Sequence, residues 1–387
     1  MSSVLGTYAR KAIAFTEGKG SYLFSENGDK YLDFVQGIAT NVLGHCHEHL
    51  VNTIQTQSKK LWHISNAFII PDQERLAKRL TDHTFADFVC FQNSGTEATE
   101  ASIKIARKYF HKIGIPEKNR IITFQGAFHG RTLAALFAAN NAKHTEGFGP
   151  KVDGFDQVPF ADHEAIKKAI NKNTAAIMVE TVMGEGGIKV IPDFCLKGLR
   201  ELCDEHKILL ILDEVQCAYR TGNFFAFEKS GIIPDIVPIA KGIGGGFPLG
   251  ACLVTKKVSV GMTPGTHGST FGGNPLAMAV GNAVLDVLLE KDFLKNVKQK
   301  GEYFQQKLNK IKEKYPKIIE EIRGEGLMVG LKMLADNTKF IKRLMDHKML
   351  TIKAEENVIR LFPPLIVSFK ELDIAINNIE KVCHEIS

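Results

Sequence analysis

The chain has 387 residues, of which 44% are hydrophobic and 24% charged, which is typical of soluble globular proteins large enough for two hydrophobic cores. Its net charge of +6 is spread along the chain without a basic run, which argues against nucleic acid as a partner. The N-terminus has no signal-like apolar segment and the longest aliphatic run, residues 208–212, is too short to span a membrane. We therefore expect a cytoplasmic protein with no membrane partner.

The seven cysteines fit the same compartment. They are odd in number and scattered, and no two form a Cys-x-x-Cys pair. This pattern disfavours both a disulfide framework and a zinc site built from thiolates.

The first two thirds of the chain alternate between strand-like and helical patterns. The apolar runs lie at residues 88–91, 120–124, 175–179, 208–212 and 236–239, and the helical patterns between them include residues 97–110 and 194–206. Nearly continuous apolar strands alternating with helices predict an α/β fold, with a mostly parallel sheet covered by helices on both faces.

After about Asn274 the pattern changes. A long charged helical stretch over residues 276–315 precedes a strand-like run at 326–332, a helix near 338–347 and two short strand-like runs at 350–352 and 358–361. These elements predict a small α+β domain at the C-terminus.

Polar residues follow the predicted strands, where open parallel sheets bind ligands. The first run leads into Ser94, Gly95 and Thr96 and then into an amphipathic helix. Two hydroxyls, a glycine and the free N–H groups of a helix start suit a phosphate. Taken alone, this segment is more often only a capped turn.

A lysine and an aspartate complete the pattern. Lys241 follows an apolar strand and precedes four glycines within five residues, yet neither a Walker motif nor a Gly-x-Gly-x-x-Gly motif is present. Asp213 ends the run at 208–212. A desolvated lysine that forms a Schiff base, a carboxylate for a pyridinium nitrogen and a phosphate site are the three requirements of pyridoxal phosphate.

Ordered motifs then identify a resemblance that runs from about Tyr8 to the last strand. The sequence resembles the class III aminotransferases, which are fold-type I pyridoxal-phosphate enzymes, and among them the acetylornithine aminotransferases. The motifs that carry the resemblance are GIATNVLGH (37–45), NSGTEATE (93–100), AFHGRT (127–132), the stretch 180–187, LDEVQ (212–216), AKG (240–242), THGSTFGGNP (266–275) and VIRLFPP (358–364).

The resemblance implies a large cofactor-binding domain over residues 46–273 and a small α+β domain over residues 274–387. The N-terminal segment, residues 1–45, is expected to pack with the small domain. It also implies a homodimer with shared active sites, pyridoxal 5'-phosphate as cofactor and no metal.

Roles carried over from the family fall on named positions of this chain. Lys241 is expected to hold the cofactor as a Schiff base and to move the proton, while Asp213 pairs with the ring nitrogen and Gln216 with the phenolic oxygen. Phe128 is expected on the ring face. The residues expected at the phosphate are Ser94, Gly95 and Thr96 of one subunit and Ser269 and Thr270 of the other.

The substrate residues follow in the same way. The resemblance implies that Arg131 receives a substrate carboxylate with help from Tyr8. Arg360 is expected to bind the α-carboxylate of glutamate, and Glu185 to pair with Arg360 when the other substrate is bound. A carboxylate that covers or releases an arginine lets one pocket accept a dicarboxylate and an ω-amino substrate in turn.

Simpler interpretations exist for several of these residues taken singly. Arg131 or Arg360 alone would more often be a structural ion-pair residue, and Phe128 alone a core residue. Glu180 and Glu185 could form an acid–base pair, although Lys241 makes that role redundant. The spacing of three histidines, His45, His47 and His49, suggests a metal site, but they have no obvious second shell.

Two departures from the family pattern lie close to the expected site. Residues 180–187 read ETVMGEGG where EPVQGEGG is usual, and the stretch after Gln216 is one residue shorter and lacks its glycines. Neither is expected to touch Asp213, Gln216 or Lys241, so we expect them to affect the choice of amino donor more than the binding of the cofactor.

We therefore expect transfer of the δ-amino group of N2-acetyl-L-ornithine to 2-oxoglutarate, in arginine biosynthesis. The alternatives are ornithine, succinylornithine, succinyldiaminopimelate or 4-aminobutyrate as donor, a glutamate-semialdehyde mutase on the same scaffold, or a binding protein without activity. The last is disfavoured by the presence of both Lys241 and Asp213.

Overall fold

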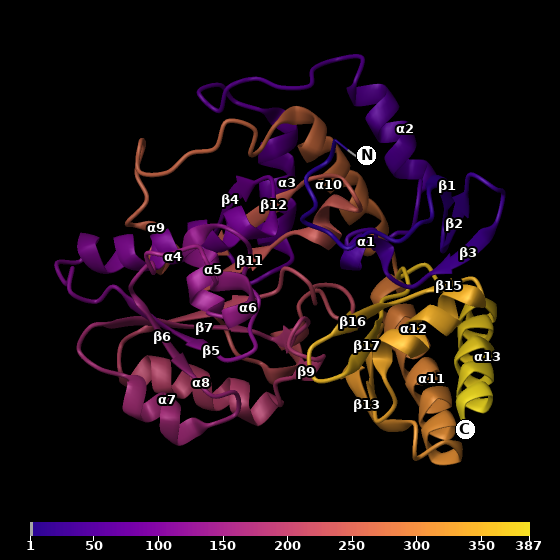
Figure 1. Ribbon diagram of the computed structural model, residues 1–387. Helices are drawn as coiled ribbons and strands as arrows, with labels where there is room; N and C mark the ends of the chain where they lie inside the picture. The colour runs from indigo at the N-terminus through magenta and orange to yellow at the C-terminus, as the bar shows by residue number, and fades with distance from the viewer. Residues whose placement is uncertain (1–2) are drawn as a thin grey trace.

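A seven-stranded sheet lies at the centre of the computed structural model, which describes residues 3–387 (Figure 1). Its strand order is β4 (Phe88–Gln92), β12 (Gly250–Val254), β11 (Ile236–Ile239), β10 (Leu209–Asp213), β7 (Thr174–Glu180), β5 (Arg120–Phe124) and β6 (Phe155–Val158). Neighbouring strands run parallel except β12, which is antiparallel to both β4 and β11. The predicted α/β fold with a mostly parallel sheet is confirmed, although β6 and β12 were not predicted.

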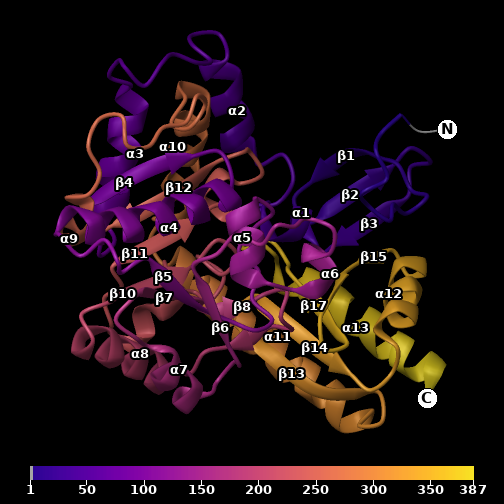
Figure 2. The same ribbon diagram turned by 60° about the vertical axis from the view of Figure 1, so that its left-hand side comes forward.

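The strands bury both faces. Leu209 and Ile211 of β10 lie in one apolar cluster, and Leu210 and Leu212 lie in another, as the two-residue repeat of a strand requires. Helices α4 (Gly95–Lys112) and α5 (Leu133–Ala139) cover the first face, and α7 (His163–Ala169) and α8 (Asp193–Glu205) cover the second (Figures 1 and 2). This burial on two sides explains why the strands read as continuous apolar runs.

The N-terminal segment and the C-terminal part of the chain share a sheet. Strands β1 (Phe15–Lys19), β2 (Tyr22–Ser25) and β3 (Lys30–Asp33) pair in order, and the fourth strand is β15 (Met349–Leu350), parallel to β3. Figure 2 shows these strands beside the C-terminal helices. The boundaries after residues 45 and 273 stay predictions.

A second small sheet forms the C-terminal part. Its order is β13 (Ile319–Glu325), β14 (Met328–Met333), β17 (Val358–Leu361) and β16 (Ile352–Ala354), and every pair is antiparallel. Helices α11 (Phe293–Lys314), α12 (Asn337–Asp346) and α13 (Phe369–Ile386) pack around it.

The remaining elements are short or connect these layers. They are α1 (Gln36–Ala39), α2 (Glu48–Gln57), α3 (Pro71–Asp82), α6 (Ala142–Thr145), β8 (Val182–Met183), β9 (Lys189–Val190), η1 (Ala226–Ser230), η2 (Lys241–Gly244), α9 (Lys256–Ser259) and α10 (Pro275–Leu288).

The long helix predicted over residues 276–315 is two helices, α10 and α11. Asp292 separates them in the left-handed conformation, with φ of 63°. An L-residue in that conformation cannot continue a right-handed helix. The two helices also differ in surroundings, because α10 is buried nearly all round and packs on α2 and α3, whereas α11 buries only one stripe.

The turn between β13 and β14 contacts the loop after β10. The Leu327 N–H donates to the Arg220 carbonyl oxygen at 2.8 Å, and a Cβ at Gly326 would lie 2.3 Å from the same oxygen. Gly326 also has a left-handed φ of 55°. Only glycine fits this position without moving backbone.

We expect Gly326→Ala to lower the free energy of unfolding by roughly 2 to 4 kcal/mol, because it adds a backbone clash to left-handed strain. The matched control is Gly28→Ala, since Gly28 also has a left-handed φ, 79°, but nothing within 4 Å of its Cβ position. Strain alone should cost the control about 1 kcal/mol. Chemical denaturation of both variants measures the difference, and equal losses would show that the clash is relieved without cost.

Candidate active site

Several polar side chains meet at the carboxyl edge of the central sheet. Glu180 ends β7, Asp213 ends β10, and Lys241 follows β11 by two residues. Asp213 continues the face of Leu209 and Ile211, so the strand repeat turns its side chain toward the α4 side. Three strands that are adjacent or next to adjacent in the sheet therefore bring two carboxylates and an amine to one place.

Asp213 is buried and paired with a histidine. It is 3% exposed, and its Oδ2 lies 2.8 Å from Nδ1 of the fully buried His129. Burial by itself would lower the pKa of His129, but the hydrogen bond and charge of Asp213, with the charge of Glu180, raise it overall. A buried carboxylate is costly without a partner, and His129 supplies that partner for Asp213.

His129 was not predicted as a site residue. It stands inside the AFHGRT motif next to Phe128, so the motif held the only sequence signal for it. Its Nε2 is buried and has no partner among residues 3–387.

Glu180 holds two backbone segments in place. One carboxylate oxygen accepts from the Phe128 N–H at 2.8 Å and the other from the Gly184 N–H at 3.2 Å. Burial raises the pKa of Glu180 to about 7, and the charge of Asp213 adds to this rise while His129 and the two N–H groups oppose it. Glu180 thus positions the Phe128 loop.

Lys241 has the properties of a nucleophilic amine. It begins η2 with a left-handed φ of 47°, immediately after the apolar strand. Burial lowers its pKa to about 8, and the carboxylates of Glu185, Glu180 and Asp213 limit the fall. An amine with this pKa is partly neutral near pH 7.5 and can add to a carbonyl.

Gln216 is buried and its Oε1 has no partner among the described residues. A Cβ at Gly184 would lie 1.7 Å from that oxygen, so the backbone of the 180–187 stretch rests directly against the amide. The expectation that this stretch does not touch Gln216 is therefore wrong. An unpaired buried amide oxygen at the edge of the site is what a bound polar group would satisfy.

The start of α4 offers free N–H groups. Ser94 caps the helix, and its hydroxyl accepts from the Glu97 N–H at 3.3 Å and donates to the Glu97 carboxylate at 2.9 Å. The N–H groups of Gly95 and Thr96 have no partner within residues 3–387. Both the capped-turn interpretation and an anion site are compatible with this geometry, because the cap leaves two donors exposed.

The hydroxyls of this loop are largely used inside the protein. Thr96 Oγ1 accepts from the Arg131 N–H at 3.1 Å and the Thr132 N–H at 3.2 Å. A Cβ at Gly95 would lie 2.6 Å from Val215, which explains the glycine. A ligand at this loop would therefore meet backbone N–H groups more than hydroxyls.

A cavity of about 370 Å³ lies beside these residues, between the large sheet and the C-terminal part. Its lining includes Phe128, Arg131, His144, Glu185 and Lys353. The Arg131 guanidinium lies 4.8 Å from the centre of the Phe128 ring and pairs with no carboxylate in the part of the chain described.

Glu185, which lines this cavity, pairs with Arg360, which comes from a different part of the chain and is not among the lining residues. Arg360 is 2% exposed, and its Nη1 donates to Glu185 Oε1 at 2.5 Å. Its Nη2 donates to the Lys353 carbonyl oxygen at 2.9 Å, and its Nε has no partner among the described residues. The two side chains thus form an ion pair in the structure, and their roles toward substrates stay predictions.

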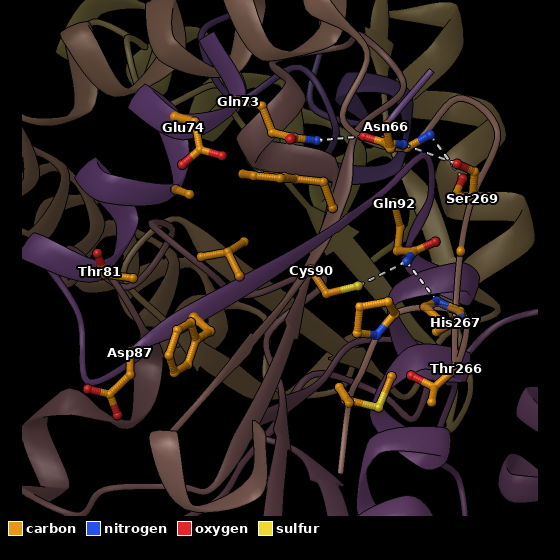
Figure 3. Close-up of a pocket in the computed structure, with 18 of the residues that line it drawn as sticks. Asn66, Gln73, Glu74, Thr81, Asp87, Cys90, Gln92, Thr266, His267 and Ser269 are labelled. Atoms are coloured by element: carbon orange, nitrogen blue, oxygen red, sulfur yellow. Dashed lines mark hydrogen bonds between the residues drawn. The ribbon is translucent and has the colours of Figure 1, made fainter. Parts of the chain in front are cut away.

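Ser269, Thr270 and Tyr8 lie elsewhere in the single chain. Ser269 Oγ accepts from Asn93 Nδ2 at 3.0 Å and lines a larger cavity of about 660 Å³, shown in Figure 3 with Gln92 bonded to His267. Thr270 is exposed, and Tyr8 is 79% exposed and lines neither cavity. The chain alone does not bring these three residues to Lys241.

The three clustered histidines have separate surroundings. His45 Nε2 lies 2.7 Å from Asp33, His49 Nε2 lies 2.9 Å from Asp286, and His47 Nδ1 is without a partner in residues 3–387. Across those same residues no three His, Cys, Asp or Glu side chains gather as a metal site would need. Likewise, no helix in the described range combines the length and apolarity needed to cross a membrane.

Comparison with known proteins agrees with this geometry. Residues 7–383 match the family model described as aminotransferase class-III. A protein named acetylornithine aminotransferase from Mesorhizobium japonicum is 56% identical over 98% of this chain and 95% of its own length, and one from Agrobacterium fabrum is 55% identical over 94% and 92%.

Solved structures of aminotransferases have the same fold as this chain. The crystal structure of ornithine aminotransferase from Toxoplasma gondii matches with a TM-score of 0.95 at 31% identity, covering 99% of this chain and 93% of that one. N-acetylornithine aminotransferase from Stenotrophomonas maltophilia matches with a TM-score of 0.85 at 32% identity, covering 98% and 97%. The chain belongs to the class III aminotransferases.

Proposed function

We propose that this chain transfers the δ-amino group of N2-acetyl-L-ornithine to 2-oxoglutarate, giving N-acetyl-L-glutamate 5-semialdehyde and L-glutamate. Identity above 50% to curated proteins named acetylornithine aminotransferase, over nearly the full chain, is the observation that carries the proposal. Arginine biosynthesis is the corresponding pathway. Ornithine is the second candidate donor, because ornithine aminotransferase gives a TM-score of 0.95.

The residues present fit pyridoxal 5'-phosphate, the cofactor of this family, which a Toxoplasma gondii relative was described as holding at its active site. Lys241 would hold its carbonyl carbon, Asp213 its ring nitrogen and Gln216 its phenolic oxygen. The fit rests on a lysine with a pKa of about 8, a buried carboxylate backed by His129, and an unpaired amide oxygen that can accept from a phenolic hydroxyl. Phe128 would cover the ring, and the residues proposed for the phosphate are Ser94, Gly95 and Thr96.

When bound, pyridoxal phosphate supplies a carbonyl that forms imines with amines and a ring that accepts electrons from the bond broken at the amine carbon. Asp213 would keep a proton on the ring nitrogen, because a carboxylate beside that nitrogen favours its protonated form. Lys241 Nζ would be the base that takes the proton from the donor's δ-carbon. The same nitrogen returns it.

Arg131 and Arg360 would bind the substrate carboxylates, with Tyr8 as a helper of Arg131. In the structure Arg360 is covered by Glu185, which leaves Arg131 as the uncovered guanidinium of the cavity. That state suits a donor with one carboxylate. Glutamate has two, so Glu185 must leave Arg360 for glutamate to bind both.

A homodimer would complete the site. Ser269 and Thr270 sit away from Lys241 in their own chain, and the next residue, Phe271, is 59% exposed. The Phe271 ring contacts that of His63, whose neighbour Trp62 is 64% exposed. Exposed aromatic residues of this kind mark protein interfaces. We propose that a second copy covers them and receives Thr270 at its phosphate site.

A cytoplasmic location is proposed from the cysteines. All seven are free thiols in the structure, which fits a reducing compartment.

The donor is tested by half-reactions of the purified cofactor-loaded protein, following its visible absorption after each amine is added separately. N-acetylornithine should bleach the band at least about tenfold faster than ornithine, succinyldiaminopimelate or 4-aminobutyrate. The reason is that the pocket must distinguish the donors by the groups attached to a single carbon atom of each. If ornithine or 4-aminobutyrate bleaches it best, the family chemistry stands and the donor assignment is wrong.

The pKa of Lys241 predicts how the apoprotein takes up its cofactor. Only the neutral amine adds to the carbonyl, so the rate of band formation should rise about tenfold per pH unit below pH 8 and level off above it. Rapid mixing of apoprotein with pyridoxal phosphate measures this rate, and Lys241→Ala, which lacks the amine, is the control. A rate that keeps rising to pH 10 would mean that Lys241 has the pKa of an ordinary lysine.

The covering role of Glu185 predicts an asymmetric defect. Glu185→Gln removes the charge that neutralises Arg360, so the half-reaction with N-acetylornithine should slow about tenfold more than the one with glutamate. Glu355→Gln is the matched control, because Glu355 lines the same cavity but pairs with Lys143 at 3.2 Å. Equal loss in both half-reactions of Glu185→Gln would contradict the role.

A further inference from the structure

The cavity contains one polar side chain in contact with Arg131 that the mechanism leaves unused. His144 lies on the short helix α6, which sits where the central sheet meets the C-terminal part (Figure 2). Its Nε2 is 3.4 Å from Arg131 Nη2, and its ring stands edge-on to Phe128 at 6.4 Å. His144 therefore borders the carboxylate site.

The contact with Arg131 decides which atoms of His144 remain available. A guanidinium only donates hydrogen bonds, so Nε2 must act as the acceptor and the proton of a neutral ring lies on Nδ1. Burial and the charges of Arg131 and Lys143 lower the pKa of His144 against the opposing effect of Glu185 and Glu355, which favours the neutral ring. The Nδ1 atom of His144 pairs with no protein atom of the described residues.

The proposed donor presents a matching group at this place. In N2-acetyl-L-ornithine one carbon carries both the carboxylate and the acetamido nitrogen, which are roughly 2.5 Å apart. A carboxylate on Arg131 would therefore hold the acetamido group within a few ångströms of the guanidinium that His144 contacts. An amide carbonyl oxygen accepts a hydrogen bond from Nδ1–H, whereas the free α-ammonium of ornithine only donates.

The charge of Arg131 acts in the same direction, while the carboxylates of Glu185 and Glu355, which line the same cavity, oppose it. The groups around the carboxylate site include the unpaired Arg131 and Lys143, whose ammonium is 3.2 Å from Glu355. A free α-ammonium would add a cation within a few ångströms of Arg131, which costs free energy, while acylation removes that charge.

We propose that His144 is a specificity residue that recognises the acyl carbonyl of N2-acylated ornithine through Nδ1–H and thereby selects it over free ornithine. The inference rests on the proposed function. It applies to N2-acylated ornithines as a class of donor, because the hydrogen bond recognises the acyl carbonyl and not the size of the acyl group.

The test compares donors in His144→Leu and His144→Gln, using half-reactions of the cofactor-loaded protein. Loss of one hydrogen bond should lower the ratio of kcat/KM for N-acetylornithine over ornithine about tenfold in His144→Leu. Glutamine keeps both a donor and an acceptor, so His144→Gln should restore most of the ratio. Ala142→Ser, on the same helix but outside this cavity, controls for damage to α6.

The outcomes separate the two proposals. A wild-type preference for N-acetylornithine that is unchanged in His144→Leu would overturn the role of His144 and leave the proposed function standing. Equal losses with N-acetylornithine, ornithine and glutamate in His144→Leu would also overturn it, because they would mean that His144 only orients Arg131. A wild-type preference for ornithine would overturn both.

Discussion

The ion pair between Asp213 and His129 is the constraint around which the site is organised. A carboxylate that is 3% exposed at the end of an apolar strand is costly unless it is paired, and His129 supplies the partner at 2.8 Å. Placing His129 there requires the loop after β5 to fold over the sheet edge. Glu180 holds that loop through the Phe128 N–H, so neighbouring strands support one another's polar ends.

The second feature of the site is its position between two parts of the chain. Glu185 comes from the region of the central sheet, whereas Arg360 comes from β17 of the C-terminal sheet, 175 residues later. Their ion pair therefore reports how these parts sit against each other. A substrate that takes Glu185 away from Arg360 exchanges one charged contact for another, which couples the charge of the pocket to the contact between the two sheets.

The sequence predicted those elements whose burial is visible as a local run of apolar residues. Strands β5, β7, β10 and β11 were found because they are apolar runs whose residues are nearly all buried. Strand β4 lies at one edge of the sheet and was found from its apolar run although Phe88 is 51% exposed, whereas β6, reading FDQV at the other edge, has no apolar run. Strand β12, reading GACLV, is also an apolar run and is buried at every residue, so the sequence carried its signal and the predicted sheet was incomplete at this point. The break at Asp292 left no glycine or proline to mark it.

The sequence by itself determined the class of fold, the helix cap at Ser94, the lysine and aspartate at strand ends and the family, because these are encoded in short-range periodicity and ordered motifs. Only the tertiary structure decided that His129 backs Asp213, that Glu185 covers Arg360 and that His144 borders Arg131. Each of these is a pairing of side chains from different elements. Such pairings depend on how strands and helices pack. No local pattern of residues specifies the distance between two side chains on different elements.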